Sequence, residues 1–273
     1  MDAAVKGSIG VFDSGVGGLT VLRALRGALP AEDFIYLGDT ARLPYGTKSR
    51  DTVVRYASQC AGVLAARGIK ALVIACNTAS AVGVDLLAQR LAPLPVIGVL
   101  EPGAEAAVRA SRSGRIAVIA TEGTVQGGAY QRAIAARRPD AVVSARACPL
   151  FVALAEEGWT DGPIVEAVAH RYLDGLFAAG PDRPDTLVLG CTHFPVLKGV
   201  IARVLGPDVT IVDSALTTAE VTARVLAQRD LARGEGIGTV TLLATDGPAR
   251  FARVGSVFSG EPVFPDDVEV IDL

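Results

Sequence analysis

The segment ALVIACNTAS, residues 71–80, joins a short apolar run to a cysteine and then to polar side chains. A short apolar run bounded by polar residues is typical of a strand that is buried on both faces of a parallel sheet. A second segment, TLVLGCTHFP at residues 186–195, repeats the same order. Because ligands bind beyond the carboxyl ends of parallel strands, Cys76 and Cys191 are both expected at a ligand site.

Other apolar runs alternate with helical segments, which predicts an α/β fold whose parallel sheets are covered by helices on both faces. The predicted strands are IGVF (9–12), FIYL (34–37), ALVIA (71–75), PVIGV (95–99), IAVIA (116–120), AVVSA (141–145), TLVLG (186–190) and VTIVD (209–213). A further run, TVTLLAT (239–245), follows a glycine-containing link.

Two helical segments begin and end at recognisable residues. The first follows Ser49, a typical N-cap, and is predicted to stop at Gly68. Cys60 lies on its apolar face, where a buried and inert thiol is expected. The second has Pro163 in its first turn and Gly180 at its predicted end.

The predicted strands form two similar halves. The corresponding positions, separated by 107 to 115 residues, are Ile9 and Ile116, Phe34 and Ala141, Leu72 and Leu187, and Val96 and Val209. Cys76 and Cys191 occupy matching places in the two halves. If the halves face each other, the two thiols face each other across a shared cleft.

The bulk composition indicates a globular protein. The chain has 273 residues, half of them apolar, which is enough for a large buried core. Its net charge of −3 argues against a dedicated nucleic-acid binder. The start of the chain, MDAAVKGSIG, lacks a signal-peptide pattern, and no apolar stretch is long enough to span a bilayer. Four cysteines without a C-x-x-C pair predict a cytoplasmic protein with free thiols.

The cysteines also allow other interpretations. Each can be a small buried apolar residue, which is the expectation for Cys148. By residue type, Cys76, Cys191, His193 and Asp13 are zinc ligands. However, C-x-H beside an isolated cysteine is not the paired spacing of structural zinc sites. A disulfide between the two strand-end cysteines is disfavoured in the cytoplasm.

The loop DSGVGGLT, residues 13–20, has the G-x-G of a nucleotide-binding turn, but two features argue against a dinucleotide. Thr20 replaces the third glycine, and Asp13 would repel a pyrophosphate at the start of the following helix. A carboxylate beside such a turn instead suits an ammonium group or the orientation of a thiol proton.

A thiolate and a thiol on opposite sides of one carbon can remove a proton from one face and return a proton to the other. This reaction is racemisation or epimerisation. It needs hydrogen-bond donors for the carbanionic charge, and the candidates are Asn77, Thr78, Thr192, Ser14 and the amides of the glycine turns. No lysine has a recognisable pyridoxal phosphate context, so chemistry without a cofactor is predicted.

Several motifs together resemble one known family. They are IGVFDSGVGGLTV (9–21), YLGDTARLPYGTKS (36–49), ACNTASA (75–81), VIGVLEPG (96–103), ATEGTVQGGAYQ (120–131), LFVALAEEG (150–158), GCTHFPVL (190–197) and VEVIDL (268–273). The chain resembles the bacterial glutamate racemases, which belong to the cofactor-independent aspartate/glutamate racemases. Related aspartate racemases usually lack the His and Phe after the second cysteine.

The resemblance implies a role for each motif. Cys76 would deprotonate D-glutamate with help from Asp13. Cys191 would deprotonate L-glutamate with help from His193, and Glu156 would lie nearby. The residues implied to line the glutamate pocket are Asp13, Ser14, Tyr45, Gly46, Asn77, Thr78, Thr124, Thr192 and His193.

The resemblance also implies two α/β domains with the active site between them, commonly in a homodimer. Residues 1–97 and 209–273 would form the first domain and residues 98–208 the second, so that the halves exchange their last strands. The product, D-glutamate, would supply peptidoglycan synthesis and so cell-wall biogenesis and cell shape. Because some family members bind DNA gyrase, a second role stays open.

The chain departs from the family pattern at Gly127, where serine is frequent, and at TDGP (245–248), where a second acid is usual. Aspartate is an alternative substrate. A ligand-binding or regulatory module without turnover is an alternative of a different class.

Overall fold

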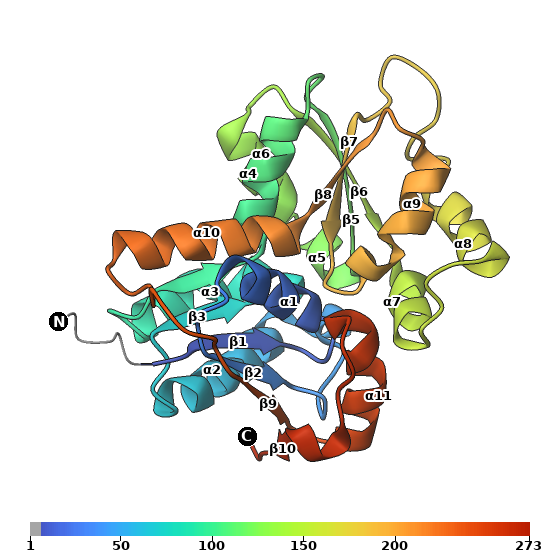
Figure 1. The fold of residues 1–273 in the computed structure, drawn as a ribbon. Coiled ribbons are helices and arrows are strands. Elements are labelled where there is room, and N and C mark those ends of the chain that lie inside the picture. Colours follow the sequence, from blue (N-terminus) through green and yellow to red (C-terminus); the bar gives the residue numbers. More distant parts are fainter. Residues whose placement is uncertain (1–6) are drawn as a thin grey trace.

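The computed structural model describes residues 7–273, and the chain forms two lobes, each built on a parallel sheet (Figure 1). The strand order of the first sheet is β10-β9-β2-β1-β3-β4 and that of the second is β6-β5-β7-β8. The first sheet comprises β1 (Ile9–Asp13), β2 (Phe34–Gly38), β3 (Ala71–Ile74), β4 (Val96–Gly98), β9 (Val240–Ala244) and β10 (Val268–Val270). The second comprises β5 (Arg115–Ala120), β6 (Val142–Ala147), β7 (Thr186–Gly190) and β8 (Thr210–Asp213). Within the segment MDAAVKGSIG, where no signal-peptide pattern is found, residues 1–6 lie outside the described residues.

Helices cover both faces of each sheet, and a separate apolar cluster fills the space on each face. The helices are α1 (Leu19–Ala28), α2 (Arg50–Ala66), α3 (Asn77–Arg90), α4 (Leu100–Ala110), α5 (Glu122–Gln126), α6 (Ala129–Arg137), α7 (Pro149–Glu156), α8 (Pro163–Leu173), α9 (Lys198–Leu205), α10 (Ser214–Gln228) and α11 (Pro248–Ser259). Single 3₁₀ turns are η1 (Tyr45–Thr47), η2 (Phe194–Leu197) and η3 (Pro265–Asp267). Within residues 7–273, no helix combines the length and the apolar character that a bilayer span requires.

The sheet order confirms the predicted α/β class and the predicted correspondence of the halves. The order β2-β1-β3-β4 in the first sheet is repeated as β6-β5-β7-β8 in the second, and all of these pairs are parallel. The loops after β3 and β7, which hold the two strand-end cysteines, therefore occupy equivalent places in the two lobes.

The expected exchange of last strands is wrong. Strand β8 pairs with β7, so it remains in the second sheet although it was predicted to return to the first lobe. The first sheet is instead extended by β9, which pairs with β2, and by β10. An apolar run shows that a strand is buried but not which sheet it joins. The chain returns to the first lobe through α10, which packs against α1 and α4 and lies between the lobes in Figure 1.

The predicted helix ends are confirmed except one. The Ser49 hydroxyl accepts a hydrogen bond from the Thr52 N–H at 3.4 Å, and Gly68 has the positive φ of a helix stop. The second helix, α8, begins at Pro163 as predicted but ends at Leu173, well before Gly180. There the Leu173 carbonyl accepts both the Leu176 and the Phe177 N–H, which closes a tight turn and returns the Phe177 ring to the core.

A close backbone approach before β9 gives a stability prediction. The Gly238 N–H donates to the Pro30 carbonyl, and a Cβ at this glycine would lie 1.7 Å from the Glu32 carbonyl oxygen. Gly238→Ala should therefore push β9 away from β2 and lower the free energy of unfolding by about 1–3 kcal/mol in urea titrations. Gly234→Ala is the matched control, because nothing lies within 4 Å of its Cβ position. Equal stability of the two variants would contradict this account.

Candidate active site

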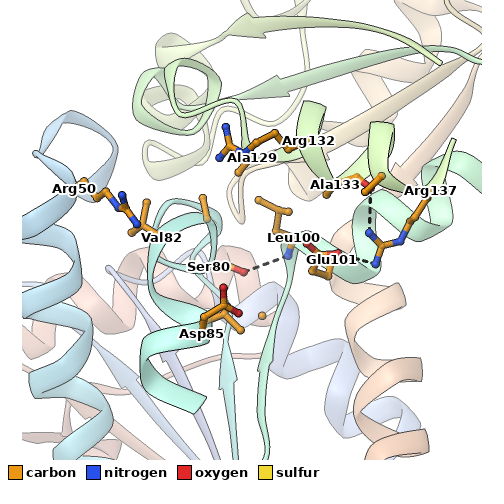
Figure 2. Close-up of a pocket in the computed structure, with 14 residues that line it drawn as sticks. Arg50, Ser80, Val82, Asp85, Leu100, Glu101, Ala129, Arg132, Ala133 and Arg137 are labelled. Atoms are coloured by element: carbon orange, nitrogen blue, oxygen red, sulfur yellow. Dashed lines mark hydrogen bonds and ion pairs between the residues drawn. The ribbon is translucent and has the colours of Figure 1, made fainter. Parts of the chain in front are cut away.

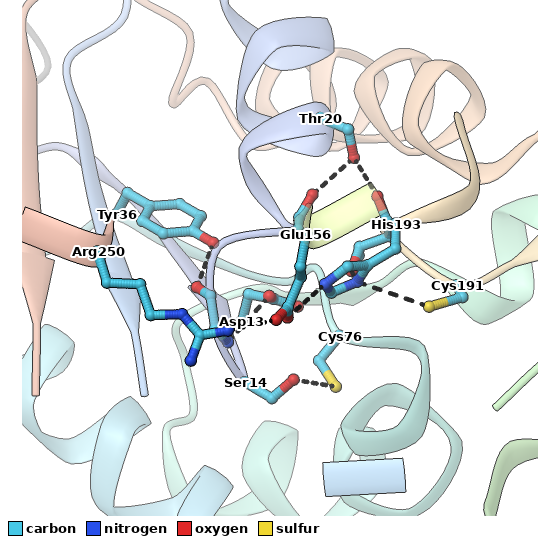
Figure 3. Close-up of polar contacts among 12 residues, drawn as sticks. Asp13, Ser14, Thr20, Tyr36, Cys76, Glu156, Cys191, His193 and Arg250 are labelled. Carbon is cyan, nitrogen blue, oxygen red and sulfur yellow. Dashed lines mark hydrogen bonds and ion pairs between the residues drawn. The ribbon is translucent and has the colours of Figure 1, made fainter. Parts of the chain in front are cut away.

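Most of the predicted site residues lie at the carboxyl ends of β1, β3 and β7, where the two lobes meet (Figure 3). The others come from η1 (Tyr45 and Gly46), α5 (Thr124) and α7 (Glu156). The Thr20 hydroxyl, at the start of α1, donates to the Thr192 carbonyl at 3.1 Å and so joins the lobes. The turn requires glycine at position 17, because a Cβ on Gly17 would lie 2.6 Å from both His193 Nδ1 and Thr192 Oγ1. The loop that resembled a nucleotide-binding turn is therefore packed against the second cysteine motif.

Cys76 is buried at the N-terminus of α3 among groups of the first lobe. Its thiol donates to Ser14 Oγ at 3.5 Å, and its sulfur accepts the Ala79 N–H at 3.5 Å. Burial, followed by the nearby Asp13 carboxylate, raises the pKa of the Cys76 thiol to about 12. In this state the Cys76 side chain is a protonated thiol and suits the role of proton donor.

Asp13 is fully buried at the end of β1. Its Oδ2 accepts the Gly15 N–H at 3.0 Å, while no group within the described chain bonds to Oδ1. Burial raises the pKa of this carboxyl, and the charge of His193 opposes the rise. A buried carboxyl with one free oxygen next to Cys76 can accept a proton or bind a cationic group.

Cys191 lies beside a histidine and a glutamate in the second lobe. Its sulfur is 3.8 Å from His193 Nδ1, and His193 Nε2 is 3.1 Å from Glu156 Oε1. Burial alone would lower the pKa of the imidazole, but the hydrogen bonds to Cys191 and Glu156 outweigh it and raise the pKa to about 10. A charged imidazolium that donates to sulfur stabilises a thiolate. The two cysteines thus have opposite surroundings.

Hydroxyl and amide groups from both lobes line the same junction. The Thr78 hydroxyl lies 3.1 Å from that of Thr121 and 3.2 Å from that of Thr124. The Tyr130 hydroxyl donates to Asn77 Oδ1 at 2.7 Å. Two of these residues, Thr121 and Tyr130, were not singled out from the sequence, although both lie in the quoted motif at 120–131.

Tyr45 and Gly46 contact the junction differently from each other. The Tyr45 ring is buried, and its hydroxyl donates to the Asp39 carboxylate. Gly46 lies directly against the Thr121 side chain, which a Cβ would meet at 2.7 Å. Of this pair, Gly46 is the residue whose backbone approaches the second lobe.

Two neighbouring cavities open between α2, α3, α4 and α6, and neither is lined by Cys76 or Cys191. One, of about 500 Å³, is lined by Arg50, Ser80, Asp85 and Arg137 among others (Figure 2). The second, of about 430 Å³, reaches Thr78 and includes Gly127, the position where the family often has serine. Among residues 7–273, no group of three or more His, Cys, Asp or Glu side chains is arranged to hold a metal ion.

Comparisons with known proteins agree on one family. The model of a family described as Asp/Glu/Hydantoin racemase matches residues 9–222. A glutamate racemase of Geobacter metallireducens is 53% identical over 254 residues, which is 93% of each chain. The crystal structure of glutamate racemase from Thermus thermophilus in complex with β-chloro-D-alanine is 46% identical with a TM-score of 0.88 and covers 99% of both chains. That of the Francisella tularensis enzyme in complex with D-glutamate is 37% identical with a TM-score of 0.89 and covers 97% of both chains.

Proposed function

Because this chain belongs to the Asp/Glu/hydantoin racemase family, among its glutamate racemases, we propose that it is an isomerase that interconverts L- and D-glutamate by two-base chemistry. Cys76 and Cys191 would act on opposite faces of the substrate Cα without a cofactor. The observation that carries this proposal is the equivalent position of the two thiols. Each follows a matching strand of its own lobe, and each has its own ionisable partner.

In the L-to-D direction, the Cys191 thiolate removes the Cα proton of L-glutamate and becomes a thiol. The Cys76 thiol then donates its proton to the opposite face, which leaves a thiolate and D-glutamate. The D-to-L direction reverses both transfers. His193, held by Glu156, would support the charge on Cys191, and Asp13 would exchange protons with Cys76.

The developing charge on the substrate carboxylate requires hydrogen-bond donors that are already in place. We assign this role to hydroxyl, amide and backbone groups at the lobe junction. The proposed pocket residues are Asp13, Ser14, Tyr45, Gly46, Asn77, Thr78, Thr124, Thr192 and His193. The Thr78 and Thr124 hydroxyls, which contact each other across the lobes, would both contact the ligand.

Incubation in D₂O tests the substrate. L-glutamate should exchange its Cα proton and racemise, whereas L-aspartate should react with a kcat/KM about 10–200-fold lower, because it is one methylene shorter. Proton NMR of the Cα signal and chiral chromatography measure the two events. Exchange with L-aspartate alone would contradict the assignment to glutamate, and binding without any exchange would favour a regulatory module.

The resemblance that predicts this activity also implies a physiological role. We propose that the chain acts in the cytoplasm as a homodimer and that its D-glutamate supplies peptidoglycan synthesis. Expression in a bacterium that requires added D-glutamate tests this role, since growth without the supplement depends on the product alone.

A further inference from the structure

One carboxylate at the junction connects the two lobes. Arg250, on α11 of the first lobe, places a guanidinium nitrogen 2.7 Å from Glu156 Oε2 at the end of α7 in the second lobe (Figure 3). The other oxygen of the same carboxylate, Oε1, lies 3.1 Å from His193 Nε2. Arg250, Glu156, His193 and Cys191 therefore form a continuous row of contacts that begins in one lobe and ends at the thiol of the other.

Within residues 7–273, no equivalent row of hydrogen bonds links the Cys76 side to the second lobe. Its partner Asp13 is held by the Gly15 N–H, and its thiol donates to Ser14, so all of these contacts lie within the first lobe. Among the described residues, a hydrogen-bonded row that includes a group from the opposite lobe is found at Cys191 and not at Cys76, although the charge of His193 also acts on Asp13. This difference between the two thiols is not expected from the internal repeat.

The ion pair contributes little to stability, which points to another role. Arg250 is 58% exposed at its side chain, and solvent screens ion pairs with such an exposed member so that they add little stability. Glu156, by contrast, is mostly buried, its Oε2 contacts Arg250, and both residues line a cavity of about 130 Å³. Without the guanidinium, Oε2 would have no partner among the described residues, and the carboxylate would be free to rotate away from the imidazole.

We propose that Arg250 is a positioning residue that holds Glu156 in the orientation that sets His193 against Cys191, so that the competence of this thiol depends on contact between the lobes. The proposal rests on the proposed function of Cys191. Through Arg250, α11 would take part in the chemistry of Cys191 but not in that of Cys76.

The titration of His193 distinguishes positioning from a simple charge effect. The ionisable groups that face the ring are Cys191, Glu156 and Asp13, while the Phe258 ring packs against it edge-on. If Arg250 only neutralised charge, its removal would increase the negative potential at the ring and raise the pKa of His193. If Arg250 positions Glu156, its removal loses the hydrogen bond at Nε2 and lowers that pKa.

The variants are Arg250→Gln, which removes the charge, and Arg250→Lys, which keeps it. The chain has only two histidines, so imidazole NMR resolves His193 directly, and the exposed His170 serves as an internal reference. We expect a lower His193 titration midpoint and about a tenfold lower kcat in Arg250→Gln, with substantial recovery of both in Arg250→Lys. Arg253→Gln, at an exposed position of α11 without an ion pair among the described residues, should match the wild type.

An unchanged or higher His193 midpoint in Arg250→Gln would overturn the proposal. Urea unfolding of the variant should match that of the wild type, which separates lost positioning from lost structure. The NMR result stands even if the wild type fails to racemise glutamate. Failure of the proposed function and failure of this inference are therefore distinguishable.

Discussion

Cys76→Ala should abolish racemisation but retain exchange of the Cα proton of L-glutamate with solvent, and Cys191→Ala should show the same behaviour with D-glutamate. In the first variant, Cys191 still removes the proton from its own face and returns a solvent deuteron there. No acid remains on the opposite face, so the configuration is kept. Chiral chromatography combined with mass spectrometry in D₂O separates deuterated substrate from inverted product.

The expected loss in racemisation is large, because each positioned acid or base contributes roughly 10²–10⁴ in rate. Cys148→Ala is the matched control, since this thiol is buried in the second lobe and its pKa is raised to about 12 by burial. The control should racemise at nearly the wild-type rate. Retained racemisation in either active-site variant, or exchange of both enantiomers, would contradict the two-base assignment.

The two directions of this reaction are linked by thermodynamics. Because the enantiomers have equal free energies in solution, kcat/KM must be the same in both directions for the wild type and for every variant. An asymmetry between the thiols can therefore be observed only in kcat, in KM or in the exchange of each enantiomer. This is why the cysteine variants are best judged by exchange rather than by kcat/KM.

The sequence was sufficient for the features that repeat or that lie in short motifs. Strands such as β3 are apolar throughout, so their burial was predictable, and the polar residues after Cys76 and Cys191 marked the carboxyl ends of two strands. The end of α8 was missed, because the return of Phe177 to the core depends on packing rather than on the position of Gly180. The sheet that β8 joins was missed, because an apolar run does not specify its neighbours.

The contacts around the site were less predictable than its residues. Glu156 and Arg250 are 94 positions apart, and an exposed arginine within a helix has no pattern that distinguishes it from a surface residue. The close approach of Gly17 to His193 likewise joins segments that only the folded chain brings together. Sequence reasoning identified the groups that suit proton transfer, whereas the structure was needed to show which groups hold them in place.

His193→Asn should lower kcat by roughly 10²-fold, the lower end of the range for a positioned acid or base. The asparagine amide can still donate a hydrogen bond toward the Cys191 sulfur. It cannot take up a proton, and it is too short to reach Glu156. The charge that supports a thiolate at Cys191 is therefore lost, while the side chain still fills much of the same space.

The pH dependence of the same variant identifies the cause of the loss. The pKa of His193 is raised to about 10, so the ring of the wild type keeps its charge from pH 6 to 9 and loses it only as the pH rises through 10. Activity that depends on the imidazolium should accordingly fall on the alkaline side and not near pH 6.5. In His193→Asn this alkaline fall should disappear. If kcat and the pH profile of the variant match the wild type, the imidazolium of His193 is not what stabilises the Cys191 thiolate. The contacts from Arg250 and Glu156 to His193 would then not influence Cys191.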